Sequence, residues 1–460
     1  MSEGASVSWD EEVEVAVLGG GPGGSTAAAR LAQLGRRALL LEQQRFPRFH
    51  IGESLLPSSA PVLRTLGLHD ELDRRFLRKY GARFLDDELG PGHAEAEARY
   101  VFAEAFPPAI PHSWQVPRAE FDELILRRAE ALGADVREGW QARRALFDGD
   151  TVVGLEALSP KGELRRIRAQ VVVDATGRDA LLAHGPHRQR LDPSDPTALP
   201  GGRTRVAGLD KTAIFTHVEG GHRNPGDDAG QIEITILAGR NEDGSTPGWA
   251  WFIPFRDGRS SVGFVLSSEL VRARIADAQS LFGAGEPPAA ARGERLAKVF
   301  AEQVTRSPWM RWLLRDAGPF AEVRAAADYS FRVETLAGNG WLAVGDAAGF
   351  IDPLFSTGAH LAMGGADHAA AVIDAALREG DVRAARFDPY ARKLRAAGDL
   401  FLGAVQSFYR GELRGMLFAQ KQRPALRKTI TSMLAGDVFH EESPGPLWAA
   451  FLRERFPARA

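Results

Sequence analysis

The 460-residue chain contains no cysteine. That absence excludes disulfide bonds, thiolate metal sites, iron–sulfur clusters and a cysteine nucleophile, so any redox chemistry must fall to a cofactor without cysteine ligands. The chain also lacks an excess of charge of one sign, because 57 Lys and Arg stand against 60 Asp and Glu. Without a basic field, nucleic acid is not an expected partner.

Long hydrophobic runs are missing as well. Nowhere do about 18 apolar residues follow one another, which is the length that a membrane-spanning helix requires. Residues 1–14 are acidic and lack the basic flank and apolar stretch of a secretory signal. We therefore expect no membrane span and a cytoplasmic location. The 11 histidines form no spaced ligand set, so no metal is expected either.

Glycine, in contrast, is abundant, and the 49 glycines and 27 prolines indicate many tight turns and loops packed close to a ligand. Residues 13–18 are apolar and β-branched, as in a buried strand, and they lead into Gly19, Gly21 and Gly24. An Ala-rich helical stretch follows, and the next predicted strand ends at Glu42. Strand, glycine turn, helix and strand form a βαβ unit.

In this setting the three glycines match a dinucleotide-binding fingerprint. Such glycines let the turn close and the backbone approach a pyrophosphate at a helix N-terminus, while an acid such as Glu42 accepts hydrogen bonds from ribose hydroxyls. A glycine turn that only packs a helix against a strand would have the same sequence pattern. The acid disfavours a phosphorylated ribose but does not separate FAD from NAD.

A second motif separates the two cofactors. A predicted strand at 340–344 precedes Gly345 and Asp346, whose carboxylate could hydrogen-bond the polyol of a ribityl chain, a group that NAD lacks. A helix N-cap is an equally adequate reading of Asp346. Together with the segment 174–177 (DATG), which ends another predicted strand, the arrangement favours FAD.

The pattern changes between about residues 185 and 328, where alternating runs such as 231–238 and 260–267 predict a mostly antiparallel second sheet. The tail from Asp388 is helical and amphipathic. The expected fold class is therefore α/β, with a Rossmann-type FAD-binding domain interleaved with a mostly antiparallel β-sheet substrate domain and followed by a C-terminal helical region. The predicted boundaries are 10–75, 117–184 and 330–377 for the FAD-binding domain, 76–116 and 185–329 for the substrate domain, and 378–460 for the helical region.

Several longer motifs carry a family resemblance. They are FPRFHIGESLLPSS at 46–59, QVPRAEFDELIL at 115–126, Trp-x-Trp-x-Ile-Pro at 249–254 and Phe-x-x-Pro-x-x-Ser-x-Gly at 350–358. With them, most of residues 10–375 resembles the FAD-dependent halogenases of the p-hydroxybenzoate-hydroxylase-like flavoproteins, in particular their phenol- and pyrrole-type branch. The two signatures in this order are far more specific than the glycine fingerprint.

The resemblance implies that FADH2, O2 and chloride or bromide yield hypohalous acid, which reaches a lysine and halogenates an electron-rich aromatic. The matching lysine is Lys79, in FLRKYGARF. A desolvated lysine has a lowered pKa and can either hydrogen-bond hypohalous acid or carry the halogen as a haloamine. A surface lysine at an arginine-rich helix end would show the same local sequence.

Further roles follow from the same resemblance. Thr357 and Gly358 match the halide site, and Trp249 and Trp251 match the barrier between flavin and substrate cavity. An ordinary glycine turn and plain core aromatics are the alternative readings of these residues. The resemblance also implies a set of cofactor-binding residues, namely Gly19, Gly21, Gly24, Glu42, Arg118, Gly345, Asp346, Pro353 and Ala359.

The chain departs from the tryptophan halogenases at Phe355, where those enzymes carry a glutamate. This is similar to the phenol- and pyrrole-type branch, whose substrates are free or tethered to a carrier protein. His360 fits a satisfied helix-start histidine and also a contact with flavin or substrate. Glu53, His112 and His360 are unranked candidates for a base that activates the aromatic.

No second glycine fingerprint for NAD(P)H is present, which fits FADH2 supplied by a separate reductase. The predicted enzyme is thus a two-component halogenase of secondary metabolism, such as antibiotic biosynthesis. The alternatives are an FAD-dependent monooxygenase (hydroxylase) or a prenyl-chain reductase on the same fold, and a flavin-binding protein without turnover.

Overall fold

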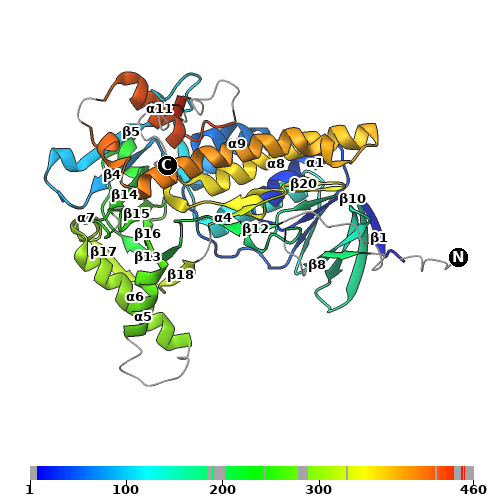
Figure 1. The fold of residues 1–460 in the computed structure, drawn as a ribbon, viewed down its shortest axis with the longest axis horizontal. Coiled ribbons are helices and arrows are strands. Elements are labelled where there is room, and N and C mark those ends of the chain that lie inside the picture. The colour runs from blue at the N-terminus through cyan, green and yellow to red at the C-terminus, as the bar shows by residue number, and fades with distance from the viewer. Residues whose placement is uncertain are drawn as a thin grey trace.

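The computed structural model describes residues 8–183, 188–190, 202–242, 244–277, 289–327, 330–419, 422–439, 447–448 and 450. Two large sheets lie towards opposite ends of an elongated molecule, and the long helices α8 (Thr357–Glu379) and α9 (Ala384–Tyr409) run lengthwise along it (Figure 1). Of the helices among the described residues, none combines the length and the apolar character needed to cross a bilayer.

The first sheet is built around parallel strands. Its members are β1 (Glu11–Leu18), β2 (Ala38–Glu42), β7 (Asp135–Glu138), β8 (Gln141–Asp148), β9 (Thr151–Leu158), β10 (Leu164–Asp174), β11 (Arg188–Arg190), β20 (Ala337–Gly338) and β21 (Trp341–Ala343). The order β7–β2–β1–β10–β21 is parallel throughout, and β8 and β9 extend it as an antiparallel hairpin. Residues 15–18 of β1 are fully buried, as expected of a parallel strand that is covered on both faces.

One face of this sheet is covered by helices α1 (Pro22–Gln33), α4 (Arg118–Ala131) and α8, which share its largest apolar core. The arrangement confirms the predicted Rossmann-type unit. Because the chain passes from strand to helix at the carboxyl ends of parallel strands, the β1–α1 turn, the end of β2 and the end of β10 meet at one edge of the sheet.

The second sheet contains β4 (Gly81–Asp86), β5 (Glu97–Val101), β13 (Lys211–Gly220), β14 (Ile232–Ile236), β15 (Gly248–Pro254), β16 (Arg259–Ser267), β17 (Ala317–Phe320) and β18 (Arg324–Ala327). Its strands pair antiparallel except for β14 and β4, which are parallel. The predicted mostly antiparallel sheet is therefore confirmed. It is interleaved with the first unit, because β4 and β5 precede α4 in the chain.

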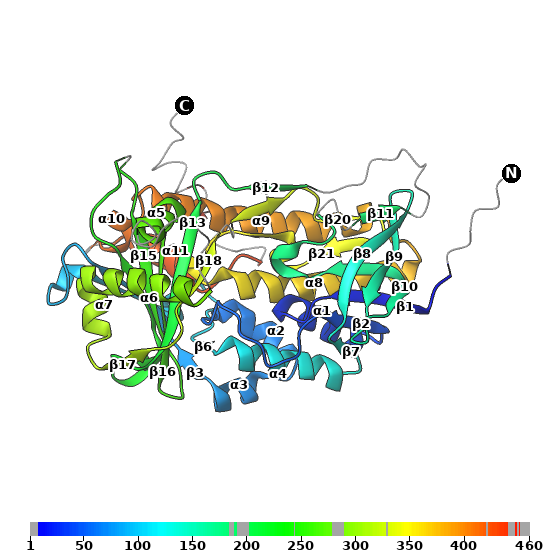
Figure 2. The ribbon, with the colours of Figure 1, turned by 90° about the horizontal axis from the view of Figure 1, so that it is seen from below.

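Alternate residues of β15 serve two different cores, as the two-residue repeat of a strand requires. Trp249, Trp251 and Ile253 pack with the C-terminal helices, whereas Ala250 and Phe252 pack with α6 and α7. Figure 2 shows α5 (Ser268–Asp277), α6 (Ala289–Arg306) and α7 (Pro308–Leu313) on that other side of the sheet. The two indoles therefore face the interior of the molecule.

Short elements complete the described fold. They are α2 (Ala60–Thr65), α3 (His69–Arg75), β3 (Leu77–Lys79), β6 (Ser113–Gln115), β12 (Arg203–Arg205), β19 (Phe331–Val333), β22 (Gly349–Phe350), α10 (Arg414–Leu417) and α11 (Pro424–Leu434), with single 3-10 turns between them. Strands β3 and β6 pair with each other, and β19 pairs with both β12 and β22.

The C-terminal region, predicted to be helical from Asp388, forms the separate helices α9, α10 and α11. Helix α9 begins earlier, at Ala384, and ends at Tyr409 because Gly411 takes a positive φ of 77°. The Glu412 N–H then bonds back to the Ser407 carbonyl, a helix-ending pattern that glycine favours. Of the predicted region 378–460, the structure describes residues 378–419, 422–439, 447–448 and 450.

Candidate active site

The β1–α1 turn uses its glycines in two ways. Gly19 has a φ of 107°, and a Cβ on it would lie 2.3 Å from the Ala175 carbonyl oxygen. A Cβ on Gly24 would lie 1.9 Å from the Gly19 carbonyl oxygen, so both positions are needed for packing. Gly21 is different, because its Cβ would meet only the Arg48 guanidinium, at 3.5 Å. Its backbone therefore faces open space that a ligand could fill.

Glu42 is fixed at the edge of that space. Its carboxylate accepts hydrogen bonds from the Gly20 N–H at 2.7 Å and from the Gln44 N–H at 2.8 Å, and the side chain is only 5% exposed. Helix α1 begins beside it without a side-chain cap, so the first-turn N–H groups are open to an anion. This cradle fits the ribose and pyrophosphate of a dinucleotide.

A cavity of about 810 Å³ extends from the glycine turn to β15 of the second sheet. All the predicted site residues except Gly24 and Lys79 line it: Gly19, Gly21, Glu42, Arg118, Trp249, Trp251, Gly345, Asp346, Pro353, Thr357, Gly358 and Ala359. The fold thus brings together residues as far apart in the sequence as Gly19 and Ala359. Size, cradle and carboxylate together fit FAD.

Asp346 lies in a short turn after β21. Burial raises the pKa of Asp346 to about 6, against the opposing charges of Arg118 and Arg178. Asp346 is not a helix N-cap, because the turn at 345–348 begins after Val344 and has no side-chain cap. Arg118 is itself held by Asp122, through bonds of 2.6 and 2.9 Å, and by the Ile51 carbonyl at 2.8 Å.

Helix α8 begins at Thr357, another residue that lines the cavity. Ser356 precedes it with a left-handed φ of 57°, and no side chain caps the first turn. A Cβ on Gly358 would lie 3.2 Å from the Phe350 ring, so a larger residue would press on that ring. A 23-residue helix with an open N-terminus presents convergent N–H groups and a positive potential to the cavity.

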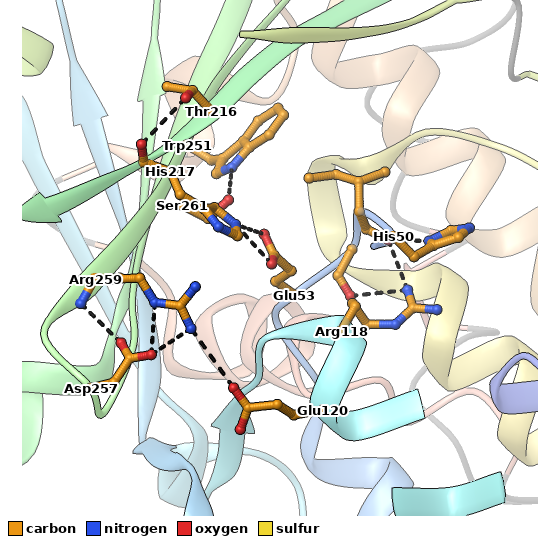
Figure 3. Close-up of polar contacts among 12 residues, drawn as sticks. His50, Glu53, Arg118, Glu120, Thr216, His217, Trp251, Asp257, Arg259 and Ser261 are labelled. Carbon is orange, nitrogen blue, oxygen red and sulfur yellow. Dashed lines mark hydrogen bonds and ion pairs between the residues drawn. The ribbon is translucent and has the colours of Figure 1, made fainter. Parts of the chain in front are cut away.

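The two indoles on β15 are fixed by hydrogen bonds. Their ring centroids lie 5.7 Å apart, and both rings are almost fully buried. Trp249 Nε1 donates to the Tyr409 hydroxyl at 3.0 Å, and Trp251 Nε1 donates to Ser261 Oγ at 3.1 Å, the second contact being visible in Figure 3. Together they form a rigid aromatic wall of the cavity.

Lys79 is buried, with 1% of its surface exposed. Its Nζ donates to Ser54 Oγ at 2.9 Å and to the Leu55 carbonyl at 3.1 Å, and it lies 5.3 Å from the centroid of the Phe102 ring. Burial lowers the pKa of Lys79 to about 7. Among the described residues it forms no ion pair with a carboxylate. The surface-lysine reading is therefore wrong.

Lys79 does not line the cavity but stands directly behind its wall. Ser54, which holds the Lys79 amine, is itself a lining residue, and its neighbour Leu55 supplies the second acceptor. The strand pairing that places the lysine here joins Lys79 to Ser113 between β3 and β6. Ser54 thus joins the amine to the lining of the flavin-sized space.

Of the three unranked bases, only Glu53 lines the cavity. Its carboxylate is 1% exposed and lies 3.0 and 3.1 Å from His217 Nε2, as Figure 3 shows. His360 is buried in α8 with its Nδ1 3.1 Å from Ser59 Oγ and does not line the cavity. Sequence reasoning missed His217, which sits in an ordinary strand pattern of β13.

His112 belongs to a separate cluster with His69 and Asp73, whose ligand atoms lie within 4.8 Å of one another. Asp73 already accepts from Arg78 Nε at 2.8 Å and from Trp114 Nε1 at 2.9 Å. The hydrogen bond from Arg78 lowers the pKa of Asp73 to about 2. The carboxylate is thus neutralised by a guanidinium, and the cluster is an ion pair flanked by histidines.

Comparisons with known proteins point to one family. A profile of the FAD binding domain matches residues 12–194, and a profile of tryptophan halogenase matches residues 243–418. A flavin-dependent halogenase of Armillaria mellea is 32% identical over 411 residues, which are 86% of this chain and 72% of the relative. A 1H-pyrrole-2-carbonyl-(peptidyl-carrier protein) chlorinase of Pseudomonas fluorescens is 28% identical over 94% of this chain and 90% of its own length.

Solved structures agree with this assignment. The flavin-dependent brominase Bmp2 superposes with a TM-score of 0.77 and 25% identity, covering 96% of this chain and 98% of its own. The myxobacterial chondrochloren halogenase CndH superposes with a TM-score of 0.70 and 28% identity, covering 94% and 92%. The likeness thus extends over nearly the whole length of the chain.

Proposed function

Because this chain belongs to the flavin-dependent halogenases, we propose that it halogenates a phenol or pyrrole ring with hypohalous acid by way of the Lys79 amine. It is an FAD-dependent halogenating oxidoreductase that takes a halide as co-substrate. The observation that carries the proposed role of Lys79 is the burial of its amine against Ser54, a residue that lines the flavin-sized cavity.

At the flavin end we assign the cradle to backbone N–H groups and two carboxylates. The first-turn N–H groups of α1 would hold the pyrophosphate, Glu42 a ribose, and Asp346 the ribityl chain, with Gly19, Gly24 and Gly345 shaping the turns. When bound and reduced, FAD supplies the electrons with which O2 and halide become hypohalous acid. We propose that the open N-terminus of α8, at Thr357 and Gly358, holds the halide.

At the lysine end, the neutral amine is the reactive form. A neutral amine has two N–H donors, which match the two acceptors Ser54 Oγ and the Leu55 carbonyl, and its lone pair is left over. That lone pair attacks the halogen of hypohalous acid, and one amine proton leaves with the hydroxide as water. The haloamine then passes the halogen to the ring and recovers a proton from it.

Trp249 and Trp251 would separate the two reactions. Their bulk keeps the aromatic substrate away from the flavin, so that oxygen is not transferred directly to the ring and only small hypohalous acid passes to Lys79. This arrangement favours halogenation over hydroxylation, the main rival on this fold.

The acceptor is proposed to be a phenol or pyrrole because electrophilic substitution needs an activated ring. Phe355, where tryptophan halogenases carry a glutamate, supports that branch, and one relative is named for a pyrrole on a peptidyl-carrier protein. We propose that this aromatic is free or tethered to a carrier protein and that a separate flavin reductase is the partner. We also propose that the domains meet at residues 75, 116, 184, 329 and 377.

The test is an assay with purified protein, a flavin reductase, NADH and bromide, offered free phenols and pyrroles and their carrier-tethered forms. We expect a brominated ring, detected by the isotope doublet of bromine in mass spectrometry. Hydroxylated product without brominated product would favour a monooxygenase. Flavin that binds without oxygen consumption would favour a protein without turnover.

A further inference from the structure

The hydroxyl of Tyr409 lies at the meeting point of three elements. Tyr409 is the last residue of α9 and is 5% exposed. Its hydroxyl accepts from Trp249 Nε1 at 3.0 Å and donates to Asp352 Oδ2 at 3.0 Å. The chain of bonds is directional: an indole N–H, a hydroxyl that both accepts and donates, and a carboxylate that only accepts.

Asp352 ties this chain to the halide end. Its other oxygen, Oδ1, accepts from the Leu354 N–H at 3.0 Å and so shapes the turn 353–355 that leads into α8. Burial raises the pKa of Asp352 to about 7, while the nearby charge of Lys211 favours the carboxylate. A buried carboxylate is costly unless its oxygens are bonded, and here both are.

The end of α9 is also joined to the segment that leads into β15. The Thr246 N–H donates to the Tyr409 carbonyl at 2.8 Å, and Thr246 Oγ1 donates to the Phe408 carbonyl at 3.2 Å. The Lys211 amine lies 4.3 Å from the centroid of the Tyr409 ring. The ring is therefore restrained by backbone and by charge as well as through its hydroxyl.

We propose that Tyr409, together with Asp352, is a positioning residue that fixes the Trp249 indole and thereby decides how much oxidant becomes halogenated product. This inference rests on the proposed barrier role of Trp249. Helix α9, which belongs to neither motif of the family signatures, then controls the wall between flavin and substrate. It also links that wall to the turn before the halide site.

Replacing Tyr409 by Phe removes one hydroxyl and leaves the ring. We expect FAD affinity and oxygen consumption to stay as in the wild type, while the share of turnover that ends as halogenated product falls about 5-fold, the effect of one ordinary hydrogen bond. The lost share should appear as hydrogen peroxide or hydroxylated product. The matched control is Tyr390→Phe, since Tyr390 lies on the same helix, is equally buried and donates to the Ala343 carbonyl at 2.6 Å.

A double-mutant cycle separates positioning from general destabilisation. If Tyr409 acts through the indole, Tyr409→Phe should change the product partition little in a Trp249→Phe background. Asp352→Asn, which keeps the side-chain volume, should lower the halogenated share of product in the wild-type background but not in the Trp249→Phe background. If Tyr409→Phe does not fold, the double-mutant cycle can be measured with Asp352→Asn instead.

Two results would overturn the inference. One is an unchanged partition in folded Tyr409→Phe or Asp352→Asn protein, and the other is an equal loss in Tyr390→Phe. A wild-type protein that yields no halogenated product would instead contradict the proposed function itself, so the two failures are distinguishable.

Discussion

The flavin end and the proposed lysine end of the active site are built from different kinds of chemical group. The flavin end is an open cavity shaped by backbone, in which glycines make room and N–H groups face the ligand. The proposed lysine end lies behind the cavity lining, where one buried amine is held by Ser54 and Leu55 and flanked by Phe102. Cofactor binding thus depends on groups within short chain segments, whereas the proposed reactivity of the Lys79 amine depends on how separate segments pack around it.

We expect the largest effect from removing the Lys79 amine. Lys79→Met keeps the length of the side chain and removes the amine, so we expect halogenation to fall by about 100-fold or more, the usual size of a lost reactive group. FAD binding and oxygen consumption should be unchanged. Liquid chromatography with mass spectrometry measures the product, and Lys298→Met, at an exposed position on α6, is the control. Undiminished halogenation would remove Lys79 from the mechanism.

The pH dependence of the halogenation rate tests which protonation state of Lys79 is reactive. Burial lowers the pKa of Lys79 to about 7, so the reactive neutral amine prevails above pH 7 and the ammonium below it. We expect the halogenation rate to be flat above about pH 7 and to fall about tenfold per unit below it, once FADH2 oxidation is followed separately and is shown not to limit the rate. A rate that rises as the pH falls through 7 would mean that the ammonium is the active form.

A smaller effect comes from the glycines of the flavin end. Gly24→Ala should lower the free energy of unfolding by about 2 kcal/mol, because its Cβ would collide with the Gly19 carbonyl oxygen. Gly21→Ala should leave the melting temperature near that of the wild type, because its Cβ meets only Arg48 at 3.5 Å. Its methyl group would instead occupy ligand space and weaken FAD binding roughly tenfold. Equal melting temperatures for both variants would contradict the packing argument.

Local patterns explain what the sequence could predict. The glycine turn, Glu42 and Asp346 each depend on a few consecutive residues after strands of the first sheet, and the parallel order of that sheet brings them to one cavity. The paired indoles follow from the two-residue repeat of β15 in the second sheet. The antiparallel second sheet likewise follows from its alternating runs.

The rest depended on contacts that no local pattern carries. Trp249 and Tyr409 are 160 positions apart, and Glu53 and His217 are 164 apart. The burial of Lys79 comes from a three-residue strand, which is too short for periodicity to reveal which way its side chains point. Composition alone favours an exposed lysine there, and only the resemblance to a family singled it out.

The central claim is that the oxidant is made at one end of the site and spent at the other by an amine. It is tested by letting reduced FAD, O2 and bromide react on the enzyme without an aromatic, removing flavin and free bromine species by rapid gel filtration, and then adding a phenol or pyrrole. The wild type should still brominate close to one equivalent of the ring, and Lys79→Met should brominate none. No brominated ring from the wild type after this separation would contradict the account.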